Sequence, residues 1–386
     1  MNLQLKKYTF FPFLILFPAI VLAQGTGVNT NGSTLTAPQT AVPFLNITPD
    51  SRSGALGDAG VALSSDVNAN YWNPAKLAFL EENNVVSLSY SPWLRQLEPD
   101  LSLSYLSYAH KIDERNTIGA SLRYFNYGAV PLSDVYANSE GTYYPSDYSL
   151  NVSWARKYGD GFSLGLTAGF VYSNLSSTNF ALGSAQTGQA GSAFLAGASL
   201  FYKSELQEFG SDATFAFGTN VSNIGTKMSY GVSSPKQFLP ANLKIGFANT
   251  VELDDYNQLT LTLDLNKLLV PANGANNNVS VTSGIFGSFS DAPGGASQEF
   301  QLITFSPGVE YWYNKLFALR AGYFFESQNN GGAHYLTLGT GFKYDVFAFD
   351  FSYLAATQQN SALANTLRFT LTANLGPNKP KTNGKN

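Results

Sequence analysis

The sequence contains no cysteine and few charged residues. Asp, Glu, Lys and Arg make up 12% of its 386 residues, against roughly a quarter in ordinary soluble proteins. Without cysteine, the chain can form no disulfide framework and cannot be a lipoprotein anchored through that residue. The formal net charge of −4 gives no sign of a basic patch, so nucleic acid is not expected as a partner.

Residues that usually carry catalysis are also scarce. The only two histidines, His110 and His334, lie far apart in the sequence. With no cysteine available, a metal site would need carboxylate ligands. We therefore expect no catalytic residues, no metal and no cofactor, and we do not expect an enzyme.

Beyond the N-terminus, no apolar run approaches the roughly 18 residues of a membrane helix. At the N-terminus, two lysines precede an apolar run from Tyr8 to Leu22, and Ala23 follows it. This pattern predicts a secretory signal peptide over residues 1–23, cleaved after Ala23. The alternative is an uncleaved membrane anchor, which the two prolines within the run make less favourable.

Aromatic residues, in contrast, are plentiful. The sequence has 22 tyrosines and 29 phenylalanines, and aromatic residues make up 14% of it. Few charges with many aromatics suit a protein whose outside contacts lipid and whose inside contacts water. Because lipid cannot satisfy an open sheet edge, a membrane protein without apolar helices must be a closed barrel.

Alternation of apolar and polar residues supports the barrel. In the last segment, 365–375, Leu367, Phe369 and Leu371 fall on one face of an extended strand, and Arg368 and Thr370 fall on the other. Such alternation over about ten residues is what a tilted transmembrane strand requires. About fourteen segments show it: those beginning near residues 85, 101, 118, 148, 162, 192, 212, 241, 257, 301, 316, 334, 346 and 365.

The connections between these segments alternate in length. Short ones, such as 113–116, 159–161 and 254–257, are separated by mostly long ones at about 129–146, 176–191, 224–239 and 268–300. Short periplasmic turns alternating with longer extracellular loops are typical of outer-membrane barrels. The sequence therefore predicts an all-β fold, a transmembrane antiparallel barrel of about 14 strands over residues 84–375. The polar-face residues Asp264, Lys343, Asp350 and Arg368 are expected to form ion pairs that hold the barrel rigid. Lining a permeation path is the alternative.

The segments that flank the barrel have a different composition. Residues 24–40 are rich in Gly, Thr and Asn and predict a flexible leader, and residues 376–386 form a polar tail. Residues 41–83 combine short apolar pieces with Gly, Asp and Asn turns. We expect them to fold into the lumen as a plug, since a wide barrel otherwise leaves an aqueous channel. An arm lying outside the barrel is the alternative.

Several sequence blocks resemble a known family. SRSGALGDAGVA at 51–62 and NANYWNPAKLA at 68–78 look like the N-terminal signature of the PorV (LptO) outer-membrane proteins of the type IX secretion system. The segments at 309–327, 337–354 and 365–375 also resemble PorV. The triplet Asn73-Pro74-Ala75 is similar to the hatch motif of the wider FadL-like transporter barrels.

The resemblance implies a non-enzymatic role in protein export from the cell outer membrane. Such a protein binds the translocation channel of the type IX system, accepts cargo proteins through their C-terminal signal domain, and delivers them to a surface sortase complex. Apart from these partners it contacts outer-membrane lipid. The FadL-like motif alone would instead suggest a transporter of hydrophobic small molecules.

Two predicted extracellular loops carry apolar residues that could contact cargo. One includes Trp93, Leu94 and Leu97, and the other includes Pro131, Leu132 and Tyr136. Exposed apolar patches often mark partner surfaces. The alternative is that these loops fold down over the barrel mouth and bury their apolar side chains.

Overall fold

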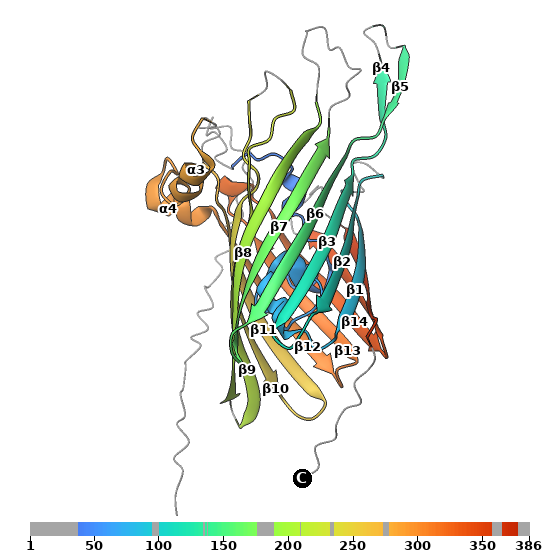
Figure 1. Cartoon of the computed structure of the whole chain (residues 1–386), viewed down its shortest axis with the longest axis vertical. Helices are drawn as coiled ribbons and strands as arrows, with labels where there is room; N and C mark the ends of the chain where they lie inside the picture. The colour runs from blue at the N-terminus through green and yellow to red at the C-terminus, as the bar shows by residue number, and fades with distance from the viewer. Residues whose placement is uncertain are drawn as a thin grey trace, which may run out of the picture. The chain divides into compact units, whose positions relative to one another are not determined.

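The computed structural model describes residues 38–94, 100–133, 136, 138–175, 189–208, 210–231, 235–272, 278–356 and 365–376. Fourteen strands in this part of the chain form one closed antiparallel barrel (Figure 1). The predicted strand count and fold class are confirmed. The predicted signal peptide, the leader up to residue 37 and the polar tail from residue 377 lie outside the described residues.

Consecutive barrel strands pair with one another, and the barrel closes where the first strand pairs with the last, with Val85 opposite Asn374 and Tyr90 opposite Phe369. The barrel strands are β1 (Asn84–Pro92), β2 (Ser102–Lys111), β3 (Asn116–Asn126), β6 (Ser146–Lys157), β7 (Phe162–Asn174), β8 (Gly191–Glu208), β9 (Ser211–Gly225), β10 (Asn242–Glu252), β11 (Asn257–Leu268), β12 (Ile303–Tyr313), β13 (Phe317–Phe325), β14 (His334–Tyr344), β15 (Phe347–Ala356) and β16 (Thr366–Asn374).

The barrel wall is polar inside and apolar outside. In β16, Thr366, Arg368 and Thr370 are buried, whereas Leu371 is exposed on the other face. The same alternation repeats in β12, where Thr304, Ser306 and Glu310 are buried. Because side chains of a strand alternate between its two faces, the buried polar residues point into the barrel and the exposed apolar ones point to lipid.

The loops at the two ends of the barrel differ in length, as predicted. Turns such as 112–115, 158–161 and 253–256 lie at one end. The other end carries the long connections, which marks it as extracellular in an outer-membrane barrel. Two of these connections contain structure that the sequence did not predict: the hairpin of β4 (Val130–Ser133) and β5 (Ser139–Tyr143), and the helices α3 (Val281–Gly287) and α4 (Gly295–Gln301). A short turn of 3-10 helix, η4 (Gln328–Asn330), follows β13.

Residues 41–80, here called the internal segment, precede β1 and are almost completely buried. The segment folds into four short helical turns: η1 (Pro43–Asn46), α1 (Ser51–Gly54), α2 (Ala69–Trp72) and η2 (Pro74–Phe79). Its hydrogen-bond partners include Ser107 of β2, Ser199 of β8, Asp264 of β11 and Thr370 of β16. These partners lie on strands all around the barrel, so the internal segment occupies the barrel interior. None of the described helices is long and apolar enough to cross a membrane.

Candidate functional site

The triplet Asn73-Pro74-Ala75 lies at the start of η2 and joins the internal segment to the wall. The Asn73 amide nitrogen donates to the carbonyl oxygens of Val61 (3.1 Å) and Leu200 (3.0 Å). Its oxygen caps η2 by accepting from the Ala75 backbone N–H. Ala75 also donates to Ser199 Oγ and accepts from Ser163 Oγ. The triplet therefore forms a buried backbone contact with strands β7 and β8.

A network of charged residues fixes the internal segment at a second place on the wall. Arg52 donates to both carboxylate oxygens of Glu310, at 3.0 and 2.8 Å, and also to Asp66 at 2.8 Å. Arg320 donates to Glu310 at 2.6 Å and to Asp350 at 2.6 Å. Glu310 is 1% exposed. Breaking a buried ion pair by removing one partner typically costs about 3–5 kcal/mol, so this network holds α1 firmly against β12 and β13.

Two further contacts anchor the loop between α1 and α2. Asp264 of β11 accepts from the backbone N–H groups of Gly60 (2.7 Å) and Val61 (2.9 Å). Arg368 of β16 lies 3.4 Å from the carboxylate of Asp58. The prediction of internal ion pairs is thus correct for Asp350 and Arg368. Asp264 instead binds backbone donors, and Lys343 is exposed, with its ammonium nitrogen 4.8 Å from the centre of the Trp312 ring.

Burial also changes the ionisation of groups in the internal segment. Burial raises the pKa of Asp50, whose carboxylate accepts from the Trp72 indole and from the Ser53 backbone. Burial lowers the pKa of Lys76 to about 8, and its ammonium group donates to the Gly60 carbonyl at 2.6 Å. Burial acts to lower the pKa of Arg52, but the charges of Glu310 and Asp66 outweigh it and raise that pKa.

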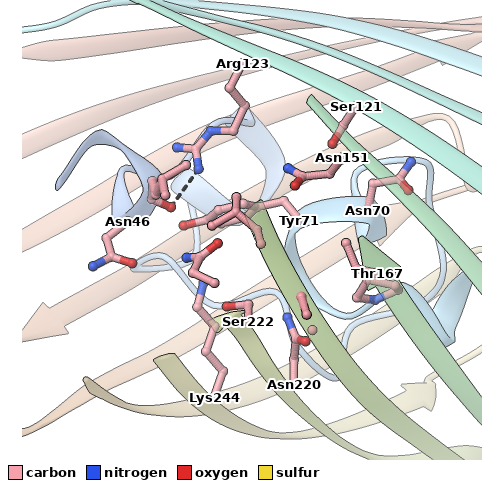
Figure 2. Close-up of a pocket in the computed structure, with 16 residues that line it drawn as sticks. Asn46, Asn70, Tyr71, Ser121, Arg123, Asn151, Thr167, Asn220, Ser222 and Lys244 are labelled. Atoms are coloured by element: carbon pink, nitrogen blue, oxygen red, sulfur yellow. Dashed lines mark hydrogen bonds between the residues drawn. The ribbon is translucent and has the colours of Figure 1, made fainter. Parts of the chain in front are cut away.

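A small cavity of about 40 Å³ remains between the internal segment and the wall (Figure 2). A cavity of this size holds a few water molecules. Most of its lining side chains are polar; they include Asn70, Tyr71, Arg123, Asn151, Asn220 and Lys244. Arg123 donates to the carbonyls of Phe44, Leu45 and Ile47, each at 2.6 Å. Lys244 Nζ lies 4.2 Å from the centre of the Tyr71 ring.

The described part of the first predicted cargo loop, Trp93 and Leu94, directly follows β1. Trp93 is half-buried and packs against the apolar cluster that contains Phe44 and Leu45. The Arg368 guanidinium lies 5.8 Å from its ring centre. Trp93 is therefore turned toward the barrel mouth, as in the alternative considered for this loop. Leu94 is also half-buried, and Leu97 lies outside the described residues.

The second predicted loop extends from the barrel as the β4–β5 hairpin (Figure 1). Tyr136, near its tip, is 82% exposed. Pro131 is exposed and Leu132 half-buried. The hairpin pairs only with itself, so both of its outer edges are unpaired within the described residues.

Residues of catalytic type do not converge on a reaction centre. The spacing Gly-x-Ser-x-Gly occurs at Gly161 to Gly165, but Ser163 lies within β7 and donates to the Ala75 carbonyl at 2.7 Å. It is thus not on the strand-to-helix turn that a hydrolase nucleophile requires. His110 Nδ1 lies 2.7 Å from Asn84 Oδ1 near the periplasmic turns. Among the described residues, no group of three His, Asp or Glu side chains could hold a metal ion.

Sequence reasoning missed Arg52, Glu310, Arg320 and Arg123 as anchoring residues. A signal existed for the three wall residues among them, because they stand at polar-face positions of apolar strands, where a charge needs an interior partner. The pairing itself joins residues that are more than 250 positions apart, such as Arg52 and Glu310.

Fold and interior together define an outer-membrane β-barrel whose lumen is occupied by its own N-terminal segment. The model of the family described as type IX secretion system protein PorV matches residues 30–275. The chain belongs to this family and is an outer-membrane protein of type IX secretion.

Several solved structures are similar to this chain at low sequence identity. The toluene transporter TodX of P. putida is 11% identical, with a TM-score of 0.50, over 85% of this chain and 99% of its own. The toluene transporter TbuX of Ralstonia pickettii is 14% identical, with a TM-score of 0.43, over 84% and 96%. A FadL homologue of Pseudomonas aeruginosa is 12% identical, with a TM-score of 0.40, over 88% and 100%. No protein of curated function matches the sequence.

Proposed function

We propose that this protein is a non-enzymatic carrier of the type IX secretion system. It binds the translocation channel, accepts cargo proteins through their C-terminal signal domain on the extracellular side, and delivers them to the surface sortase complex. The internal segment acts as the plug of the barrel, so the cargo never crosses this lumen. Membership in the PorV family supports the export role.

The observation that carries the proposal is the way the internal segment is fixed. It is tied to the wall through Asn73 at one place and through Arg52 and Glu310 at another. Opening a path for a polypeptide would break several buried ion pairs and hydrogen bonds at once, each costly to leave unmade. Cargo contacts therefore belong on the outer surfaces of the molecule.

The β4–β5 hairpin is the favoured cargo contact. It projects from the extracellular end of the barrel and carries an exposed aromatic residue, Tyr136. Its unpaired edges are suited to receive an extended segment by strand addition. Trp93 and Leu94 are weaker candidates, because they are half-buried at the barrel mouth.

Transport of hydrophobic small molecules is the alternative function. It would call for a continuous apolar path through or beside the plug. The cavity of Figure 2 is lined mostly by polar side chains, among them Arg123 and Lys244. An apolar solute there would displace water from polar and charged groups, which is unfavourable. The interior thus supports the secretory role over the transport role.

The test replaces the exposed hairpin residues Pro131 and Tyr136 by Asp. Loss of a central aromatic contact at an interface commonly weakens binding by about tenfold or more. We expect proteins with type IX signal domains to accumulate in the periplasm, while co-purification of the barrel with the channel is retained. Pulse labelling followed by cell fractionation measures this.

The matched control is Tyr256→Asp. Tyr256 is 59% exposed but lies in the short turn between β10 and β11, at the opposite end of the barrel. This variant should export cargo normally. Normal export by the hairpin variant, at equal barrel levels in the membrane, would contradict the assignment of the hairpin to cargo.

A further inference from the structure

A second pocket, of about 360 Å³, lies on the outer face of the barrel at its extracellular rim. Its apolar lining comes from Ile303 and Phe305 of β12, Phe325 of β13 and Phe300 of α4. The ring centroids of Phe300 and Phe305 are 5.8 Å apart, and those of Phe305 and Phe325 are 6.5 Å apart. Its volume falls in the range of ligand pockets, roughly 300–1,000 Å³.

The pocket is continuous with the surface that faces lipid. In β12, Thr304 and Ser306 are buried toward the lumen, so Ile303 and Phe305 point outward. Below the rim, the same outer wall exposes Leu319, which is 48% exposed. An outward apolar surface at this position is bathed in hydrocarbon in an outer-membrane barrel, so lipid has direct access to the pocket.

Helix α4 is held in place on the wall. Its Glu299 forms an ion pair with Lys267 of β11, with the atoms 2.9 Å apart and both residues no more than 9% exposed. The other oxygen of Glu299 accepts from the Ala292 backbone N–H at 2.7 Å. Because this buried pair fixes α4, the neighbouring Phe300, although 62% exposed, has a defined position over the pocket.

The rim of the pocket is polar. Gln301, Glu326, Ser327, Gln328 and His334 line it above the aromatic side chains. Burial raises the pKa of Glu326 to about 7, so near neutral pH a fraction of its carboxyl groups is protonated and able to donate a hydrogen bond. The helical connection at 278–301 contains no Lys or Arg. This composition favours uncharged oxygen and nitrogen groups at the rim over a phosphate.

We propose that this pocket binds one acyl chain of an outer-leaflet membrane lipid. The chain lies between Phe300 and the aromatic side chains of β12 and β13, with its ester or amide group at the polar rim. Such a lipid would occupy a specific site on the barrel, distinct from the non-specific lipid that covers the rest of the wall. This inference does not depend on the proposed export role.

The experiment places the full-length protein in lipid nanodiscs that contain a phospholipid with a photoreactive diazirine on one acyl chain. After irradiation, labelled peptides are quantified by mass spectrometry. We expect labelling of peptides containing Phe305 and Phe325 to exceed that of the peptide containing Phe342, an equally outward residue that is 52% exposed. Equal labelling of all three peptides would overturn the proposal.

The variant Phe300→Ala removes one aromatic wall. Burial of an aromatic side chain against a ligand is worth enough to change occupancy by about tenfold, so labelling of the Phe325 peptide should fall by about that factor. Phe286→Ala is the control, since Phe286 lies on α3, is 77% exposed and does not line the pocket. Heat-modifiable gel mobility verifies that each barrel is folded. Unchanged labelling of the Phe325 peptide in Phe300→Ala would contradict the proposed lipid site. If that variant does not fold, the ratio of labelling between the Phe305 and Phe325 peptides and the Phe342 peptide in the unmodified protein still tests the site.

Discussion

At the scale of single residues, the charges inside the barrel follow from the cost of burying them. A charged side chain in a low-dielectric interior needs a partner of opposite charge, because otherwise its neutral form is favoured. Glu310 has two such partners, Arg52 from the internal segment and Arg320 from the adjacent strand. One carboxylate thus links the internal segment, which contains no strands, to the barrel wall.

The variant Glu310→Gln tests this link. It leaves Arg52 and Arg320 near each other without their shared counter-charge, and loss of one partner of a buried pair costs about 3–5 kcal/mol. We expect faster amide hydrogen exchange at residues 51–66 and a lower midpoint in urea unfolding. Glu114→Gln, at an exposed periplasmic turn, should change neither. Equal exchange in both variants would show that the network does not hold the segment.

Asn73 offers a second test at this scale. Asn73→Leu leaves the Val61 and Leu200 carbonyls without their donor, and an unsatisfied buried group costs about 1–3 kcal/mol. Asn73→Asp keeps the acceptor for Ala75 but turns a charge toward two carbonyl oxygens, so it should lower stability further. The midpoints of urea unfolding show which of the two variants is less stable. A stability of Asn73→Asp equal to that of the unmodified protein would contradict the contact.

At the scale of elements, the strands and the lengths of the loops could be predicted from sequence, but the structure within the loops could not. Apolar and polar residues alternate along most of each barrel strand, because one face meets lipid and the other meets the lumen. The sequence predicts only a long loop over residues 268–300, yet this segment contains α3 and α4. These helices are only seven residues each, too short for a helical period to stand out. Likewise, burial of Trp93 depends on an apolar cluster near the barrel mouth that the local sequence does not contain.

The internal segment approaches β13 closely, which allows a test of whether this segment closes the barrel lumen. A Cβ at Gly322 would lie 2.0 Å from the Leu56 carbonyl carbon and 2.1 Å from the Gly57 nitrogen. We therefore expect Gly322→Leu to displace the segment and give larger, longer-lived channel openings in planar bilayers than the unmodified protein. Gly159→Leu is the control, since a Cβ there meets nothing within 4 Å. Identical conductance in both variants would contradict the role of the segment as a plug.

At the scale of the whole molecule, the barrel presents one surface to lipid and encloses the other around the internal segment. The strand count, the alternation of loop lengths and the family blocks at 51–62 and 68–78 could all be read from the sequence, because each is a local pattern. The contacts that fix the interior join Asn73 to β8 and Arg52 to β12. Such long-range pairings are set by three-dimensional packing, so sequence patterns alone did not reveal them.

We propose that cargo binds at the extracellular hairpin and never enters the lumen. A photoreactive amino acid placed at Tyr136, and separately at Tyr71 beside the internal cavity, tests this in living cells. The account predicts crosslinks from position 136 to the C-terminal signal domains of secreted proteins and none from position 71. Crosslinks to cargo from position 71, with none from position 136, would contradict it.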